Sequence, residues 1–420
     1  MLDLKFIRAH PDLVKHAAVT KAAPVDVDRI LELDGRVRAS IAATETLRQE
    51  RKSLSRGFST ADAAQKAELS AQSQALGDRI EAHETELESL KTELRDLLLL
   101  TPNIPDPTAP VGPDASFNVV TEISGTPPAF DFETRDHVDL VQMNGWAELA
   151  KASAISGSRT YALRGMLVRL ELALMNFALD RLAAEGFTAV SAPPFAREDA
   201  FIGTGHFPAG REDVYELRGE DLFLIGTSEV FLNSLHADEI LAEKDLPILY
   251  AGYSGCYRRE AGSGGRDVRG LLRVHHFTKV EQFVICRDDP EESRRWHERL
   301  LAIARGILEA LELPYRVVEC CTGDMGLGKV RMHDIEAWVP SLGTYRETHS
   351  CSTLHDWQAR RTNTRWRAPD KSIRPVHTLN NTAIATPRIF APLLEVHQRK
   401  DGGVNVPEAL RPYLGGIEVL

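Results

Sequence analysis

The sequence predicts an α+β protein in which a helical coiled-coil hairpin precedes a mainly antiparallel sheet with flanking helices. Two observations lead to this prediction. Within the first hundred residues, apolar side chains recur at heptad spacing, which indicates two long helices packed together. From about residue 129 onward, strand hairpins outnumber strand-helix-strand units, and this favours antiparallel pairing.

The first hundred residues supply the elements of the coiled coil. Residues 1 to about 25 predict a short helical start that breaks at Pro24. Two heptad segments follow, separated by a polar stretch from Ser55 to Ala64. We expect an antiparallel hairpin of two helices, each of roughly 30 residues and projecting roughly 45 Å. The heptad positions are Ile30, Leu33, Val37, Thr44, Leu47 and Leu54, then Leu69, Leu76, Ile80, His83, Leu87, Leu90 and Leu94.

A proline-rich linker is expected between this domain (1–100) and the rest of the chain. Residues 101–128 begin with TPNIPDPTAPVGPDAS, which holds five prolines and no periodicity. Residues 129–420 form the second predicted domain. Its helices are expected at 165–184, 288–311 and 387–398, and its strands before Pro193-Pro194 and at 222–225, 248–253, 273–284, 315–320 and 334–339.

Composition excludes several classes of protein. The 420 residues are 43% hydrophobic and 26% charged, which is ordinary for a globular protein of two or three domains. A formal charge of −11 argues against unspecific coating of nucleic acid, although a local basic surface could still bind it. Five cysteines without a CxxC pair do not predict a disulfide framework or a thiolate zinc site, and a reducing cytosol fits them.

Targeting signals are not expected either. The N-terminus, MLDLKFIRAHPDL, carries charges among its apolar residues, unlike a signal peptide. No apolar run approaches the roughly 20 residues of a membrane helix. We therefore expect a cytoplasmic protein that does not bind membranes.

The most informative segment is YRREAGSGGRDVRGLLRVHHFTKVEQF, from Tyr257 to Phe283. It predicts a strand ending in Arg258, Arg259 and Glu260, then a glycine loop, then a second strand. Arginine forks bind phosphate oxygens and an aromatic face accepts a flat ring, so this hairpin suits a polyphosphate joined to a ring. It is not a P-loop, because no helix follows the glycines.

Other polar clusters leave alternatives open. Thr227, Ser228 and Glu229 follow a short strand, where they could hold an ammonium group or simply cap a helix. Glu281 lies in a strand pattern, where it could be solvated at an edge or point into a cleft. Glu347 could hold a divalent cation or mark a polar strand end.

Two further segments are similarly ambiguous. Arg388 enters an apolar helix, where a phosphate or a structural ion pair could compensate its charge. The segment CTGDMGLGKV approaches a phosphate-binding loop, but Val330 replaces the required Ser or Thr and a strand follows, so we reject that interpretation.

Taken together and in order, these motifs resemble those of bacterial-type seryl-tRNA synthetases, which are class II aminoacyl-tRNA synthetases. The matching phrases are GTSE, REAGS, RDVRGLLRVH, FTKVEQF, CTGDMG, QARR and VPEALRPYLGG. The resemblance covers essentially the whole chain. It implies the class II antiparallel sheet, a tRNA-binding coiled-coil arm, and a homodimer that binds tRNA across its subunits. The element before Pro193-Pro194, residues 258–281 and residues 380–388 correspond to the three class II motifs.

The resemblance also implies roles for individual residues. The L-serine pocket would comprise Thr227, Ser228, Glu229, Glu281 and Thr382. The ATP site would comprise Arg258, Arg259, Glu260, Val274, Phe277, Glu347, Thr348, His349, Ser350 and Arg388. Within these sets, Arg258, Glu260 and Arg388 would be catalytic, Phe277 would stack on adenine, and Glu347 with Ser350 would hold Mg²⁺.

The chain departs from the commonest family pattern at three places. Arg259 replaces a serine, which leaves the contact of that position in doubt. His276 replaces a glutamine, and NNTAIATPR replaces NGSGLAVGR. The last is a variant found within the family.

The implied activity is ATP-dependent ligation of serine to serine tRNA through a seryl-adenylate, and serine tRNA, L-serine and ATP are the implied partners. Selenocysteine tRNA is an additional expected substrate where that pathway exists. Basic residues toward the arm tip fit tRNA, although they would also fit the solvated face of a coiled coil: Arg48, Arg51, Lys52, Arg56 and Lys66. Two alternatives differ in kind. A synthetase-like amino acid:carrier-protein ligase would lack the arm, and an interaction protein built on an inactive synthetase would have lost Arg258 and Arg388.

Overall fold

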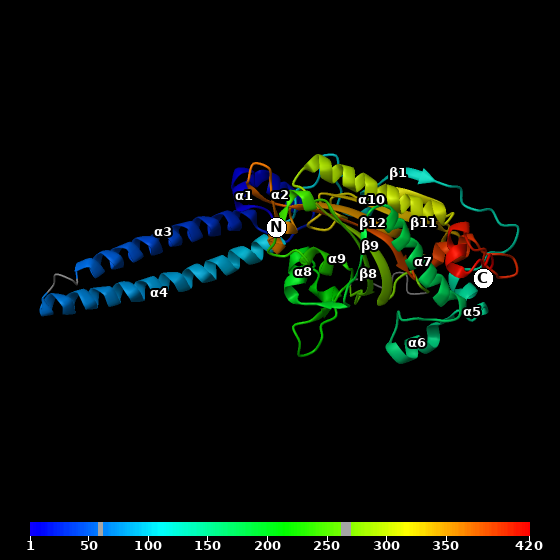
Figure 1. Ribbon diagram of the computed structural model, residues 1–420, viewed down its shortest axis with the longest axis horizontal. Coiled ribbons are helices and arrows are strands. Elements are labelled where there is room, and N and C mark those ends of the chain that lie inside the picture. The colour runs from blue at the N-terminus through cyan, green and yellow to red at the C-terminus, as the bar shows by residue number, and fades with distance from the viewer. Residues whose placement is uncertain (58–61, 262–269) are drawn as a thin grey trace. The chain divides into compact units, whose positions relative to one another are not determined.

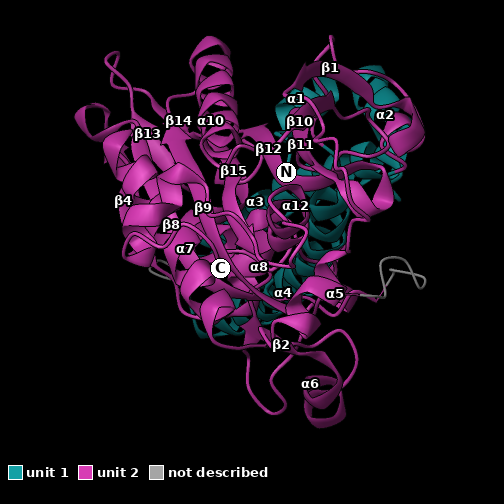
Figure 2. Ribbon diagram, turned by 90° about the vertical axis from the view of Figure 1, so that its right-hand side faces the viewer, with its two compact units in different colours: residues 1–19, 23–102 teal, residues 20–22, 103–420 magenta. Residues whose placement is uncertain are grey.

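The computed structural model describes residues 1–57, 62–261 and 270–420. Two compact units are present, one comprising residues 1–19 and 23–102 and the other residues 20–22 and 103–420 (Figure 2). Gly262, Ser263, Gly264 and Gly265 of the predicted glycine loop lie outside the described residues. Each unit is described separately below.

The first unit is built on two long antiparallel helices, α3 (Val27–Gly57) and α4 (Ala63–Leu100), which follow α1 (Leu4–Ala9) and α2 (Pro11–Thr20) (Figure 1). The antiparallel order is evident from ion pairs, since Arg29 lies 2.6 Å from Glu93 and Arg48 lies 2.6 Å from Glu84. Heptad positions form the seam, which buries Ile30, Leu33, Thr44, Leu47, Ile80, Leu87, Leu90 and Leu94. The helical hairpin is therefore as predicted, although α4 extends to 38 residues.

The second unit contains an eight-stranded sheet. Its strand order is β1-β10-β11-β12-β15-β9-β8-β4, and every neighbouring pair is antiparallel except β4 with β8. The strands are β1 (Val119–Ser124), β10 (Tyr315–Glu319), β11 (Arg331–Val339), β12 (Thr344–His355), β15 (His377–Thr386), β9 (His276–Cys286), β8 (Ile248–Tyr257) and β4 (Thr188–Ser191).

Two amphipathic helices cover this sheet, α7 (Met166–Ala184) and α10 (Pro290–Ala310) (Figure 1). Helix α10 begins with Asp289, whose side chain accepts a hydrogen bond from the Glu291 amide, and with Pro290 in its first turn. Its apolar stripe, which includes Leu300, Ala304 and Ile307, packs against β12 and β15 in the largest hydrophobic core. This packing gives the strands that carry the site a rigid backing.

Shorter elements complete the second unit. The small sheets are β14-β13-β7, β2-β3 and β5-β6. Their strands are β2 (Ala147–Glu148), β3 (Ala162–Leu163), β5 (Phe195–Ala196), β6 (Phe223–Leu224), β7 (Ile240–Ala242), β13 (Arg365–Arg367) and β14 (Ile373–Pro375). The short helices are α5 (His137–Met143), α6 (Leu149–Ser156), α8 (Glu198–Thr204), α9 (Glu229–Ser234), α11 (Ala359–Thr362) and α12 (Phe390–Val396), with 3₁₀ turns at Ala115–Phe117, Arg211–Asp213, Glu243–Asp245, Pro340–Leu342 and Glu408–Leu414.

Three strands of the eight-stranded sheet were not predicted from the sequence, and neither were six short strands of the small sheets. β1 lies inside the segment assigned to the linker, where its β-branched residues pair with β10. β12 carries Glu347 in its interior rather than beyond a strand end, and β15 carries Asn380 to Thr382 where only an approach to a helix was expected. Both strands lie in the middle of the sheet, and their polar residues hid them from a hydrophobicity pattern.

Within the described residues, no helix combines the length and the apolar character needed to cross a membrane.

Candidate active site

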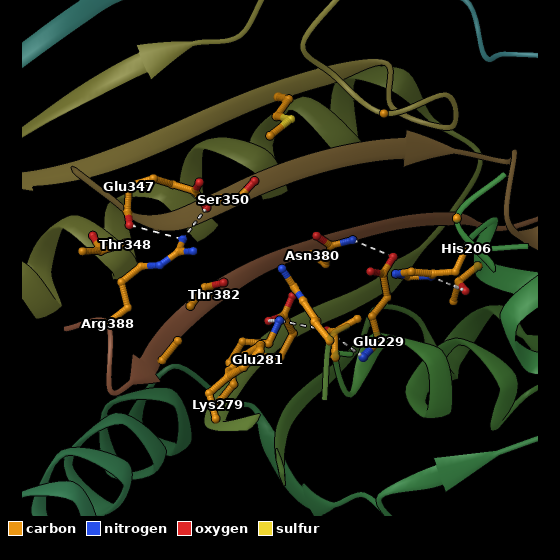
Figure 3. A pocket seen from close by; sticks show the side chains of 18 of the residues that line it. His206, Glu229, Lys279, Glu281, Glu347, Thr348, Ser350, Asn380, Thr382 and Arg388 are labelled. Atoms are coloured by element: carbon orange, nitrogen blue, oxygen red, sulfur yellow. Dashed lines mark hydrogen bonds and ion pairs between the residues drawn. The ribbon is translucent and has the colours of Figure 1, made fainter. Parts of the chain in front are cut away.

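A cavity of about 600 Å³ lies over strands β9, β12 and β15 of the main sheet (Figure 3). Helix α9 and the segments around residues 258–260 and 271–274 complete its walls. The predicted site residues that line it are Thr227, Glu229, Arg258, Glu260, Val274, Phe277, Glu281, Glu347, Thr348, Ser350, Thr382 and Arg388. The fold therefore brings together residues that are up to 161 positions apart, from Thr227 to Arg388.

Strand register places Glu281 at the floor of the cavity. On one side it is directly opposite Thr382 of β15, and on the other it is opposite Gly252 of β8. A side chain at Gly252 would not fit, because its Cβ would lie 2.4 Å from the Ser228 hydroxyl oxygen. Glu281 is only 3% exposed, so the structure places it in a cleft and not at a solvated edge.

Glu281 shares this floor with Lys279, two residues earlier on the same face of β9. The Lys279 ammonium lies 2.5 Å from a Glu281 carboxylate oxygen and donates a hydrogen bond of 2.8 Å to the Thr227 hydroxyl. Burial raises the pKa of Glu281, and the neighbouring Lys279 ammonium opposes that rise. The three side chains form a compact polar cluster that can exchange hydrogen bonds with a small hydroxyl.

A β-bulge explains how two other side chains with oxygen atoms come to face the same side. Ser350 pairs with Asp334 and Glu347 pairs with Glu336, while the register shifts by one residue between them. Strict alternation would place positions 347 and 350 on opposite faces, and the extra residue in β12 removes that conflict. Figure 3 shows Glu347 and Ser350 on one wall of the cavity.

Arg388 lies beside this pair. Its guanidinium is 3.3 Å from the Glu347 carboxylate and donates hydrogen bonds to the carbonyl oxygens of Leu272 and Glu347. The Asp334 carboxylate, which accepts a hydrogen bond from Ser350, has a pKa raised by burial and by the charge of Glu347. Two carboxylates, a hydroxyl and an arginine thus converge where a metal-bound phosphate chain could lie.

A second arginine also lines the cavity. Arg258 donates a hydrogen bond of 3.3 Å to the Gly226 carbonyl, and its guanidinium carbon lies 5.2 Å from the centre of the Phe277 ring. Glu260 forms an ion pair of 3.0 Å with Arg273. The cavity therefore brings together an aromatic face, two arginines and the apolar side chain of Val274.

Glu229, at the first position of α9, is held by two amides. Gln358 and Asn380 donate hydrogen bonds of 2.7 and 2.8 Å to the same carboxylate oxygen. His206 lies nearby, with its Nδ1 2.8 Å from the Thr204 hydroxyl (Figure 3). Burial, helped by nearby cations such as Arg258 and Lys279, lowers the pKa of His206 to about 4, so its ring is neutral at pH 7.

Comparison with known proteins gives one family for the whole chain. Residues 1–105 match the seryl-tRNA synthetase N-terminal domain, and residues 214–397 match the tRNA synthetase class II core domain (G, H, P, S and T). A serine–tRNA ligase of Deinococcus radiodurans is 50% identical over 420 residues, which cover 100% of this chain and 99% of that protein.

The chain belongs to the seryl-tRNA synthetase family.

Solved structures of this family agree with the fold. The seryl-tRNA synthetase from Pyrococcus horikoshii complexed with ATP has a TM-score of 0.92 at 41% identity, and the match covers 100% of this chain and 99% of that one. The cytoplasmic serine–tRNA ligase from Naegleria fowleri in complex with AMP has a TM-score of 0.87 at 30% identity, with 100% and 98% covered. The predicted class II sheet preceded by a helical arm is therefore confirmed. The carrier-protein ligase is not favoured, because the seryl N-terminal domain is present.

Three predicted residues of the seryl-tRNA synthetase site lie outside the cavity lining. Ser228 is fully buried, and its hydroxyl donates a hydrogen bond of 3.3 Å to the Gly252 carbonyl, so the side chain supports β8. The buried His349 ring contacts the Thr348 hydroxyl and the Ala383 carbonyl, and burial lowers its pKa to about 4. Arg259 lines a separate hollow with Arg211 and Tyr215.

Four lining or supporting residues were given no role from the sequence, namely Lys279, His206, Asn380 and Gln358. Lys279 could have been found, because it lies two positions from Glu281 in a strand pattern and so shares its face. Gln358 begins the matching phrase QARR, but its contact with Glu229 could not have been found, because the two residues are 129 positions apart along the chain.

Proposed function

We propose that this chain ligates L-serine to serine tRNA at the expense of ATP, through a seryl-adenylate. Membership of the seryl-tRNA synthetase family supports the reaction class, and relatives named serine–tRNA ligase support the amino acid. The observation that carries the serine assignment is the pairing of Glu281 with Thr382 beside Lys279 at the cavity floor. This cluster has the size and polarity to bind one hydroxyl group.

In the proposed complex, each part of serine has its own partner. Glu229 and Thr227 would bind the ammonium group, while Glu281 and Thr382 would bind the side-chain hydroxyl. A site built to hydrogen-bond a hydroxyl leaves its polar groups unpaired when the hydroxyl is missing, so alanine would be rejected by a factor of roughly 10⁴ or more. Arg258 would hold the carboxylate near the α-phosphate of ATP.

The first chemical step joins the serine carboxylate to the α-phosphorus and releases pyrophosphate. In the second step a 3′-terminal ribose hydroxyl of tRNA attacks the carbonyl carbon, and AMP leaves. Neither step uses a protein nucleophile. The residues act by positioning the reactants and by neutralising charge, with Arg258 and Arg388 on the phosphates and Phe277 against the adenine ring.

The residues near Arg388 fit a magnesium ion. Glu347 and Ser350 share one face of β12, and both offer the hard oxygen ligands that Mg²⁺ prefers. When bound, Mg²⁺ would neutralise charge on the phosphates of ATP. Two features would keep Glu347 and Ser350 in place for the ion. These are the bulge in β12 and the ion pair between Glu347 and Arg388.

The helical arm is proposed to bind tRNA. Arg51, Lys52 and Arg56 are exposed near the end of α3, and Arg51 and Lys52 line a shallow surface hollow with polar residues of α4. We also propose a homodimer that binds tRNA across its subunits, a cytoplasmic location, and serine transfer to selenocysteine tRNA where that tRNA exists.

Pyrophosphate exchange with each of the twenty amino acids tests the adenylation step. The purified chain should exchange with serine alone when ATP and Mg²⁺ are present. Exchange with glycine or alanine in place of serine would support the carrier-protein ligase. No exchange with any amino acid would favour the interaction protein.

A further inference from the structure

Glu229 is the most heavily supported side chain in the cavity wall. Its side chain accepts hydrogen bonds on one oxygen, Oε1, from Gln358 at 2.7 Å and from Asn380 at 2.8 Å. Two N–H groups on one oxygen leave the other, Oε2, available to a ligand. Figure 3 shows the Glu229 carboxylate inside the cavity, with Asn380 reaching it from β15.

The orientation of the Gln358 amide is fixed by its other neighbours. Its Nε2 also donates a hydrogen bond of 3.2 Å to the Thr204 carbonyl, while its Oε1 accepts one of 2.7 Å from the Thr378 hydroxyl. Carbonyl and carboxylate oxygens can only accept, so the amide nitrogen must face Thr204 and Glu229. Gln358 is fully buried, which leaves no water to replace these partners.

We propose that Gln358, together with Asn380, is a positioning residue for the recognition of the substrate's α-ammonium group. By occupying Oε1 of Glu229, the two amides turn Oε2 into the cavity as the acceptor for an ammonium donor. Asn380 contributes from β15, the strand that also carries Thr382, so recognition of the amine and of the hydroxyl is linked through one strand. This inference rests on the proposed function, because it takes serine as the substrate.

A purely structural role for Gln358 is the competing explanation. Gln358 immediately precedes α11, and its hydrogen bonds reach α8 through Thr204 and β15 through Thr378. If the role of Gln358 were purely structural, losing these hydrogen bonds would disturb the cavity wall, and every ligand would bind less tightly. A role through Glu229 predicts instead that only ligands with an ammonium group are affected.

The test replaces Gln358 with methionine, which has similar length and no N–H donor. In pyrophosphate exchange the KM for serine should rise about tenfold, because a hydrogen bond to a charged group is lost, while the KM for ATP stays within about twofold. The inhibition constant of 3-hydroxypropanoate, which keeps the carboxylate and hydroxyl of serine but lacks the amine, should not change. Equal weakening of serine and of 3-hydroxypropanoate would overturn the inference.

A double-mutant cycle tests whether Gln358 acts through Glu229. In a Glu229→Gln background the charge that Gln358 supports is gone, so adding Gln358→Met should raise the KM for serine by less than about twofold. Fully additive effects would contradict a role through Glu229. Gln398→Met is the matched control, because Gln398 is also buried and donates to the carbonyls of Arg135 and Glu395 away from the cavity lining.

Two outcomes separate this inference from the proposed function. If the parent chain does not exchange pyrophosphate with serine, the proposed function fails. If the parent does, and Gln358→Met leaves the KM for serine unchanged, only the inference fails. Should Gln358→Met not fold, as judged by thermal unfolding, Asn380→Ala removes the second donor to Oε1 and is expected to give the same selective rise in KM for serine.

Discussion

Among single residues, the cavity floor buries two opposite charges, each of which would destabilise the fold if it were unpaired. Lys279 and Glu281 are each no more than 5% exposed, and an isolated buried charge is strongly unfavourable. Their contact of 2.5 Å compensates both charges. Burying an ion pair contributes little to stability by itself, so the geometry is better explained by the needs of a polar ligand.

Replacing Glu281 with glutamine tests this floor. The amide keeps the shape but loses the charge, so Lys279 is left without its partner and the hydroxyl pocket is disrupted. We expect kcat/KM for serine in pyrophosphate exchange to fall by roughly a hundredfold or more, with a much smaller change in KM for ATP. Glu408→Gln, at an exposed position, is the control. Activation of serine as efficient as in the parent would remove Glu281 from the serine site.

The motifs grouped these residues in the sequence-based prediction, and the structure brings them to one cavity. From the residues alone, Glu281 remained undecided between a solvated edge and a cleft, because a strand pattern does not say what covers it. The resemblance selected the cleft, and the structure places the side chain there. The role of Gln358 could not be predicted, because no local pattern connects it with Glu229.

At the scale of elements, strand register decides which side chains meet. The bulge in β12 and the pairing of Glu281 with Thr382 depend on one-residue shifts that leave no trace in composition. The heptads of α3 and α4 were predictable because their period is regular and their seam is apolar. β15 was missed because it buries a run of Thr and Asn residues, whose partners lie on other elements.

Gly252 offers a test of this arrangement. A Cβ there would lie 2.4 Å from the Ser228 hydroxyl oxygen and 2.7 Å from a Leu232 methyl carbon, so α9 would have to move away from β8. We expect Gly252→Ala to cost about 1–3 kcal/mol of stability and to weaken serine activation, since α9 carries Glu229. Thermal unfolding and pyrophosphate exchange measure the two effects.

Gly255 on the same strand is the matched control for this substitution. The atoms nearest to a Cβ at Gly255 belong to the Tyr257 side chain, at 3.2 Å or more, and that side chain can shift. Gly255→Ala should therefore change stability much less. Equal tolerance of alanine at both positions would show that α9 does not pack on β8 as described.

At the scale of the whole molecule, buried histidines make the fold sensitive to acid. Burial lowers the pKa of His333 and of His377 to about 3, and that of His349 to about 4. Unfolding returns each ring to an ordinary pKa near 6.5, so below that pH the unfolded chain binds more protons than the folded chain. The stability that depends on these neutral rings is fully present above pH 6.5 and is lost as the pH falls toward 4.

This proton linkage predicts that the free energy of unfolding falls measurably as the pH is lowered. Between about pH 6 and pH 4, each of the three histidines should lower the free energy of unfolding by roughly 1.4 kcal/mol per pH unit as the pH falls. Urea unfolding at pH 7 and pH 5 measures the difference, and His377→Asn should reduce it. A free energy of unfolding that does not depend on pH over this range would contradict the assignment of neutral buried rings.

The division of the chain into two units predicts that the two chemical steps can be separated. Arg29 of α3 lies 2.6 Å from Glu93 of α4, which is within one helical turn of Asp96, so a short connection from Arg29 to Asp96 can replace residues 30–95. The shortened chain should keep serine-dependent pyrophosphate exchange and lose most of its capacity to charge tRNA. Charging at the rate of the full chain would show that the arm does not bind tRNA.

The central claim is that this chain transfers serine to tRNA, and aminoacylation by the full chain tests it most directly. Purified chain, ATP, Mg²⁺ and labelled serine are incubated with serine tRNA, and the label attached to the 3′ end is measured over time. We expect rapid charging of serine tRNA, dependence on ATP, and no charging of alanine tRNA used as a control. Serine-dependent pyrophosphate exchange without any label on serine tRNA would contradict it.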